Sequence, residues 1–225
     1  MLKSSEVYQR DGSSHSMTEQ SFYGSIAGFV LYGLIGTAIS AHLAIQSAFN
    51  PGIWGIIILG LVIPIVGVII AGVSNNWFFS FIGYNMVLIP FGLILAPALS
   101  HYLKEYPDVV RNAASLTAII TFVMGLAGTM FPNIFSRMGS ALFFSLSALV
   151  LVRLAGIFIP ELNSFLLIDY IAAGIFSLYI GYDMYRASTV ERNLDNAVDI
   201  ALSLYLDIIN LFLELLKIMS SKDDD

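Results

Sequence analysis

The chain has 225 residues, of which 57% are hydrophobic and only 12% are charged, whereas a soluble domain carries about 25% charged residues to cover its surface. Most of the outer surface must therefore face something other than water, which indicates an integral membrane protein whose main partner is the lipid bilayer. The net charge of −6 offers no basic surface to a nucleic acid, and the absence of cysteine excludes thiolate catalysis and thiolate metal sites.

The chain begins and ends in polar segments. Residues 1–20 are rich in serine and have no periodic apolar positions, which is typical of a disordered tail. They contain no basic segment followed by an apolar core and a cleavage site, so a signal peptide is not expected. Residues 220–225 are predicted to form a short acidic tail that ends in three aspartates.

Between these tails, residues 21–219 contain seven stretches that are long and apolar enough to be membrane-spanning helices, since a span needs about 20 apolar residues. The stretches are 22–48, 53–73, 78–99, 113–131, 138–159, 165–183 and 197–219. Short polar connections separate them, among them Asn50-Pro51-Gly52 and the charged run from Lys104 to Arg111. The predicted fold is therefore an all-α seven-helix transmembrane bundle in which consecutive helices are antiparallel. Lysine and arginine are divided almost evenly between the two sides, so charge does not predict the orientation.

The first predicted helix carries a pair of glycines, Gly24 and Gly28, with the GxxxG spacing. Small residues at this spacing let two helices approach closely. We expect this face to pack against another helix of the same bundle.

Ionisable residues within the predicted spans are few, and each costs at least about 2.5 kcal/mol in hydrocarbon, so each is a functional candidate. His42 and Arg153 lie near the ends of their spans, where a long side chain reaches the interface. Asp169 lies five residues into its span, and either a structural or a functional role is open for it.

The last predicted span has polar residues at regular helical intervals. They are Asp199, Ser203, Asp207, Asn210, Glu214 and Lys217. At about 100° per residue they fall within a sector of about 80°, so one narrow polar stripe runs along an otherwise apolar helix. Such a stripe faces either other helices or a water-filled path, and not lipid. It is therefore either a buried hydrogen-bonded seam or the lining of an ion path.

Two acids on the last two predicted helices are expected to meet. Asp183 ends the sixth span, Asp207 lies in the seventh, and the polar hairpin between the spans brings both into the same half of the membrane. Two adjacent carboxylates in a medium of low dielectric share a proton and titrate in two separated steps. The pair is a candidate pH sensor, cation site, or both; alternatively, Ser, Tyr or backbone groups satisfy each acid separately.

The segments from Gly174 to Asp183 and from Ala201 to Leu216 are similar to the last two helices of the Bax inhibitor-1 family, also called the transmembrane Bax inhibitor motif family. The run from Leu204 to Phe212, Leu-Tyr-Leu-Asp-Ile-Ile-Asn-Leu-Phe, is the most specific part. The resemblance implies a pH-sensitive calcium leak channel with its last helix enclosed by the first six. It also implies that Asp183 and Asp207 form the gate and contact the permeating metal ion.

The chain departs from the family pattern at the gate. Some members have a basic residue on the second helix that latches the aspartates, but no Lys or Arg lies between Pro51 and Leu103. A latch must then come from elsewhere, and Arg186 and Arg192 are the candidates. The short tail resembles bacterial members, which implies the bacterial plasma membrane, or an endomembrane such as the endoplasmic reticulum in a eukaryote.

Three functions are compatible with these features. The first is a calcium or other cation leak channel that needs no cofactor and can act as a monomer. The second is a proton-coupled transporter, which predicts an inverted repeat that the sequence does not display. The third is a non-conducting regulator of a protease or cell-death factor. An enzyme is not expected, because the sequence contains neither a GxSxG nor an HExxH motif.

Glu214 is predicted to have one of two roles. It lies near the far end of the polar stripe, where a carboxylate would concentrate cations at the mouth of a path. Alternatively, it pairs with Lys217 or Arg153 at the interface.

Overall fold

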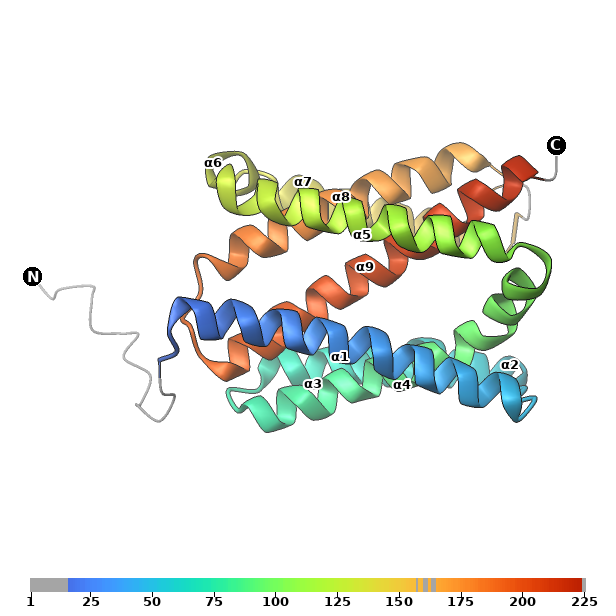
Figure 1. Cartoon of the computed structure of the whole chain (residues 1–225), viewed down its shortest axis with the longest axis horizontal. Helices are drawn as coiled ribbons and strands as arrows, with labels where there is room; N and C mark the ends of the chain where they lie inside the picture. Colours follow the sequence, from blue (N-terminus) through green and yellow to red (C-terminus); the bar gives the residue numbers. More distant parts are fainter. Residues whose placement is uncertain (1–15, 157, 160–161, 163–164, 224–225) are drawn as a thin grey trace, which may run out of the picture.

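The computed structural model describes residues 16–156, 158–159, 162 and 165–223. Its helices are α1 (Glu19–Gln46), α2 (Gly52–Ile57), the π-helical segment η1 (Ile58–Val62), α3 (Ile63–Val73), α4 (Trp77–Glu105), α5 (Pro107–Met130), α6 (Pro132–Phe135), α7 (Gly139–Ala155), α8 (Leu166–Ala187) and α9 (Leu194–Asp223). Figure 1 shows α1, α3 and α4 in one layer and α5, α7 and α8 in another, with α9 running obliquely between them.

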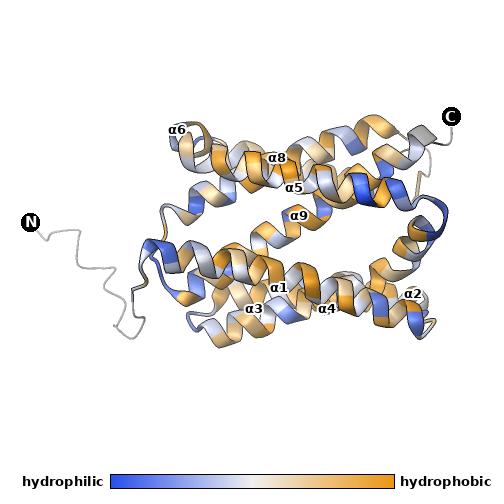
Figure 2. Ribbon diagram, viewed as in Figure 1, coloured by the Kyte–Doolittle hydropathy of each residue, from blue (hydrophilic) through white to orange (hydrophobic). Residues whose placement is uncertain are grey.

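Most residues of these helices are apolar (Figure 2). In the described part of the chain, five helical stretches are long and apolar enough to cross a membrane: α1, the continuous run Gly52–Val73, α4, α5 and α8. Large apolar side chains such as Ile35, Phe122 and Leu167 are more than half exposed on them. Because water would penalise so much exposed apolar surface, these faces contact lipid, and the chain is a multi-pass membrane protein.

α9 differs from the other helices because it is buried nearly all round. It packs against α1, α4, α5 and α8, and between Ala197 and Ser220 only Lys217 is exposed. Its polar stripe therefore faces other helices, as the helical spacing predicts.

Several helix ends differ from the predicted ones. α1 begins at Glu19 because the Thr18 side chain accepts a hydrogen bond from the Ser21 N–H and caps the helix. α4 continues to Glu105 and α5 begins at Pro107, so the charged run expected to be a loop is helical except at Tyr106. Proline suits a first helical position, where no backbone donor is needed.

The two predicted tails also differ in extent. Residues 1–15 lie outside the described residues, but the Met17 N–H donates to the Arg192 carbonyl over 2.6 Å, which joins the start of α1 to the α8–α9 connection. α9 continues through Asp223, so residues 220–223 of the predicted acidic tail are helical. Polar residues extend a helix beyond the apolar span, and hydropathy alone does not detect this.

Two prolines in the third predicted span do not end its helix. α4 passes through both Pro90 and Pro97, although each removes a backbone donor. Beside Pro90, hydroxyl groups of α1 donate to α4 carbonyls: Thr37 to Leu88 over 3.3 Å and Ser40 to Ile89 over 2.8 Å. Protein hydroxyls thus hold α1 against α4 next to Pro90.

Glycines mark where helices touch backbone to backbone. A Cβ at Gly67 of α3 would collide with the Gly83 carbonyl of α4, and a Cβ at Gly128 of α5 with the Gly181 carbonyl of α8. By contrast, a Cβ at Gly24 or Gly28 would meet no atom within 4 Å. The expectation that this GxxxG pair packs within the bundle is therefore wrong, because its face of α1 points outward.

Gly128→Val should lower the stability of the folded protein. The added side chain would force α5 away from α8, and overpacking of this kind costs about 1–3 kcal/mol. The thermal unfolding midpoint in detergent measures the effect, with Gly24→Val as the matched control that should change little. Equal midpoints for the two variants would contradict the close α5–α8 approach.

Candidate functional site

Asp183 of α8 and Asp207 of α9 meet inside the bundle. The two residues are only 3% and 8% exposed, and their carboxyl groups lie within hydrogen-bonding reach of each other. The buried Oδ2 of Asp207 has no hydrogen-bond partner within the described part of the chain. The structure thus brings together the two acids that the sequence pairs.

The packing of α8 fixes where Asp183 points. Ile180, one turn earlier on the same face, is fully buried, and Gly181 lets α8 lie directly against α5. Because residues three and four apart share a helix face, burying Ile180 also turns Asp183 inward.

Among the described residues, one cation reaches this pair. Arg186, one turn after Asp183 on α8, places Nη1 3.0 Å from Asp183 Oδ1, and its side chain is 43% exposed. Arg192 instead pairs with Glu19 at the start of α1, with Nη2 3.0 Å from Oε2. Of the two candidate latch residues, only Arg186 contacts an aspartate. Two ionised carboxylates beside one guanidinium would leave a buried negative charge unbalanced, so the site can hold a proton or a bound cation.

The N-terminal part of the stripe contains two further acids. Asp199 Oδ1 is buried and has no hydrogen-bond partner among the residues described. Asp195, one turn earlier, accepts a hydrogen bond of 2.7 Å from the Ser80 hydroxyl of α4. Sequence reasoning missed Asp195, although it continues the stripe by four residues. Ser203 lies on the same side, half-buried.

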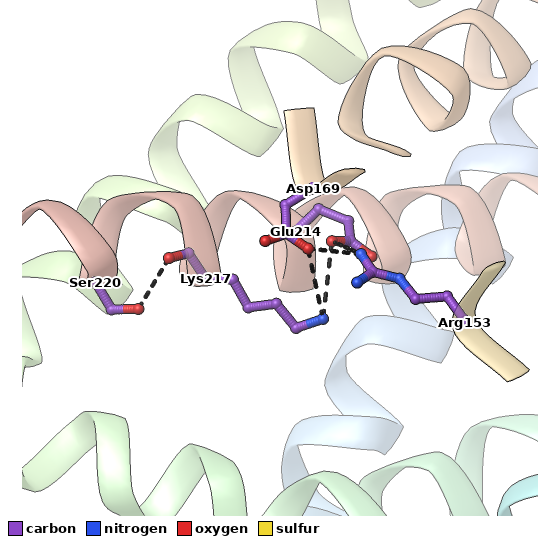
Figure 3. A network of polar contacts seen from close by, with 5 residues as sticks. All are labelled: Arg153, Asp169, Glu214, Lys217 and Ser220. Atoms are coloured by element: carbon purple, nitrogen blue, oxygen red, sulfur yellow. Dashed lines mark hydrogen bonds and ion pairs between the residues drawn. The ribbon is translucent and has the colours of Figure 1, made fainter. Parts of the chain in front are cut away.

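The C-terminal part of the stripe is held by ion pairs (Figure 3). Arg153 of α7 places Nη2 2.6 Å from Asp169 Oδ1 of α8 and 2.7 Å from Glu214 Oε2 of α9. Lys217 Nζ lies 3.9 Å and 3.8 Å from the same two oxygens. Of the two predicted roles for Glu214, the structure contains the ion pair. Asn210, between this cluster and Asp207, donates to the Leu206 carbonyl of its own helix over 2.8 Å.

Residues 19–224 match the protein family described as "Inhibitor of apoptosis-promoting Bax1". The chain belongs to this family. A Helicobacter pylori protein is 31% identical over 134 residues, which span 59% of this chain and 57% of that protein. A Campylobacter jejuni protein is 32% identical over 132 residues, 58% of this chain and 56% of its own. A Vibrio cholerae protein named "Uncharacterized membrane protein" is 26% identical over 193 residues, 81% and 83% of the two chains.

In this Bax1-inhibitor family member, a tyrosine two residues before Asp207 fixes the position of α9. Tyr205 is fully buried, its hydroxyl lies 2.6 Å from Thr37 Oγ1 of α1, and its ring centroid lies 5.5 Å from that of Tyr84 on α4. Tyr84 in turn donates to the Phe29 carbonyl over 2.9 Å. The run from Leu204 to Phe212, which carries the family resemblance, contains Tyr205. The sequence did not identify the residues that Tyr205 contacts.

Two cavities adjoin the stripe in this family member. One, of about 390 Å³, lies between α4 and α9; the other, of about 380 Å³, lies among α7, α8 and α9. Asn210 and Glu214 line both cavities. The described part of the chain contains no group of three or more His, Asp or Glu residues that could hold a metal ion.

Proposed function

We propose that the protein is a pH-sensitive calcium leak channel whose gate is the pair of Asp183 and Asp207. The observation that carries the proposal is that Asp207 neighbours the buried Asp183 and has a buried oxygen, Oδ2, with no hydrogen-bond partner among the described residues. A purely structural acid would be satisfied by donors, whereas a group that exchanges a proton for a cation needs a free oxygen.

The proposed channel has seven spans, which are α1, the run Gly52–Val73, α4, α5, α7, α8 and a central α9. α7 has 17 residues, about 26 Å at 1.5 Å per residue, and exposes Phe143 and Phe144. α9 has 30 residues and is enclosed by its neighbours, which explains how a helix with a polar stripe can cross the bilayer.

The proposed path follows α9 from Asp199 and Ser203, past Asp207 and Asn210, to Glu214. Calcium prefers oxygen ligands and takes six to eight of them. Because two acids of the described part of the chain meet at the gate, binding there should be weak, and weak binding is what conduction requires.

Arg186 is the proposed latch, in place of a basic residue on the second span. Arg186→Gln removes the cation nearest the pair, which favours the protonated forms of both acids. The midpoint of the flux–pH profile should therefore move to higher pH. Arg192→Gln is the matched control, because it removes a nearby ion pair that does not reach the aspartates. Equal midpoints for Arg186→Gln and wild type would exclude the latch.

Two other functions use the same features. A proton-coupled transporter would use the acid pair to carry protons, and a non-conducting regulator of a protease or cell-death factor would use the lipid-facing surface. For each function the proposed location is the bacterial plasma membrane, as the named Vibrio cholerae membrane protein suggests.

Calcium flux into vesicles that contain only the purified protein distinguishes the three. A channel should pass calcium down its gradient at a rate that depends on pH but persists when an ionophore equalises pH across the membrane. Flux that vanishes with the pH difference would favour the transporter, and the absence of flux at every pH would favour the regulator.

A further inference from the structure

A second cluster of charged residues lies at the C-terminal part of the stripe, away from the aspartate pair. It consists of Arg153, Asp169, Glu214 and Lys217, called here the Arg153 cluster, and it joins α7, α8 and α9 (Figure 3). Asp169 is near the start of α8 and Glu214 near the end of α9, so the cluster lies at the end of the bundle opposite the α8–α9 connection (Figure 1).

The cluster is electrically balanced, with two carboxylates and two cations. Arg153 Nη2 contacts Asp169 Oδ1 and Glu214 Oε2 at once, at 2.6 Å and 2.7 Å. These are distances of strong charge-assisted hydrogen bonds. The guanidinium therefore occupies the place between two acids where a mobile cation would otherwise be held.

Two cavities adjoin Glu214. Glu214 and Asn210 line both cavities beside α9; Arg153 lines the cavity next to α7, and Lys217 lines the one next to α4. The Glu214 side chain thus stands between two spaces, and a cationic side chain approaches it from each. Arg153 has only 25% of its side chain exposed, so its charge is weakly screened.

We propose that Arg153 is a tethered cation that blocks the far mouth of the path, and that it limits cation passage independently of the aspartate pair. This inference rests on the proposed channel function. While Arg153 is in place, a permeating cation meets a neutral cluster with its carboxylate oxygens already occupied. Without it, Asp169 and Glu214 would attract cations to the mouth.

The alternative is that Arg153 only braces three helices. The two roles predict opposite signs, because losing a brace lowers the yield of folded protein and its flux, whereas losing a tethered cation raises flux. The absence of cysteine from the chain allows a direct test, since a thiol introduced at this position is the only one that a thiol reagent can modify.

The test measures calcium flux in vesicles for Arg153→Cys before and after modification. Flux should rise about tenfold, the lower end of the effect of concentrating ions at a charged mouth, while the pH midpoint stays as in the wild type. A methanethiosulfonate that adds a trimethylammonium group should return flux to near the wild-type level. A methanethiosulfonate that adds only a neutral methylthio group should leave the flux high. Arg111→Cys, at an exposed residue paired with Asp108 at the same end, should respond to neither.

A charge-balanced variant covers the case in which Arg153→Cys does not fold. Arg153→Cys/Asp169→Asn removes one acid with the cation and leaves Lys217 near Glu214. It should show a smaller rise, because the remaining acid and cation balance each other, and the same closure by the cationic reagent. Flux of a folded variant at or below wild type, or equal effects of both reagents, would overturn the role of Arg153. No flux from wild type or variants at any pH would overturn the proposed channel function itself.

Discussion

Asp207→Asn is expected to pass calcium at a rate that no longer changes with pH. An amide has nearly the shape of the carboxylic acid but neither releases nor accepts a proton in the physiological range. Asp183 would then lie beside a neutral partner and next to Arg186, so no proton would be shared between the two positions. The variant should remain in one state, open or closed, over the whole pH range in which the wild type changes.

The control for this experiment is Asp108→Asn, which removes an exposed acid at the start of α5. Its flux–pH profile should coincide with that of the wild type. If the profile of Asp207→Asn coincides with them as well, then the shared proton does not lie on Asp207.

The double variant Asp183→Asn/Asp207→Asn should be no more impaired than either single variant. Groups that share one proton act as a unit, so removing either acid already abolishes the coupled titration, and the second change adds little. Independent acids would instead give additive effects. The rate and the pH dependence of flux, measured for all four combinations in vesicles of one composition, provide the complete cycle.

Additivity within this cycle would contradict a shared proton even if each single variant had a large effect. Elution from a sizing column in detergent checks that each variant is folded, because a neutral amide in place of Asp207 also alters a buried site. Asn is the appropriate substitute, since Ala would leave a cavity as well.

The sequence predicted the features that follow from a regular spacing of residues along a helix. The intervals of four and three residues along the last span predicted that one face of α9 is polar and buried, and this follows from helix geometry alone. The hairpin between the last two spans predicted that Asp183 and Asp207 meet, because a short connection makes neighbouring helices antiparallel.

Features that depend on which helix lies against which could not be predicted in this way. The contact of Arg153 with Asp169 depends on the rotation of α7, which is apolar on most of its faces, and the sequence did not predict it. The outward direction of Gly24 likewise follows from the packing of Gly33 against Tyr84 and Tyr205, and the GxxxG spacing is the same whichever way it points. The ends of α4 and α9 lie beyond the predicted spans because polar residues continue each helix into the interface.

Electrical recording from planar bilayers that contain only the purified wild-type protein tests the central claim most directly. With calcium as the sole permeant cation, the account predicts discrete current steps that reverse at the calcium equilibrium potential, and an open probability that changes with pH. Membranes that hold correctly folded protein and carry no such current at any pH would contradict it.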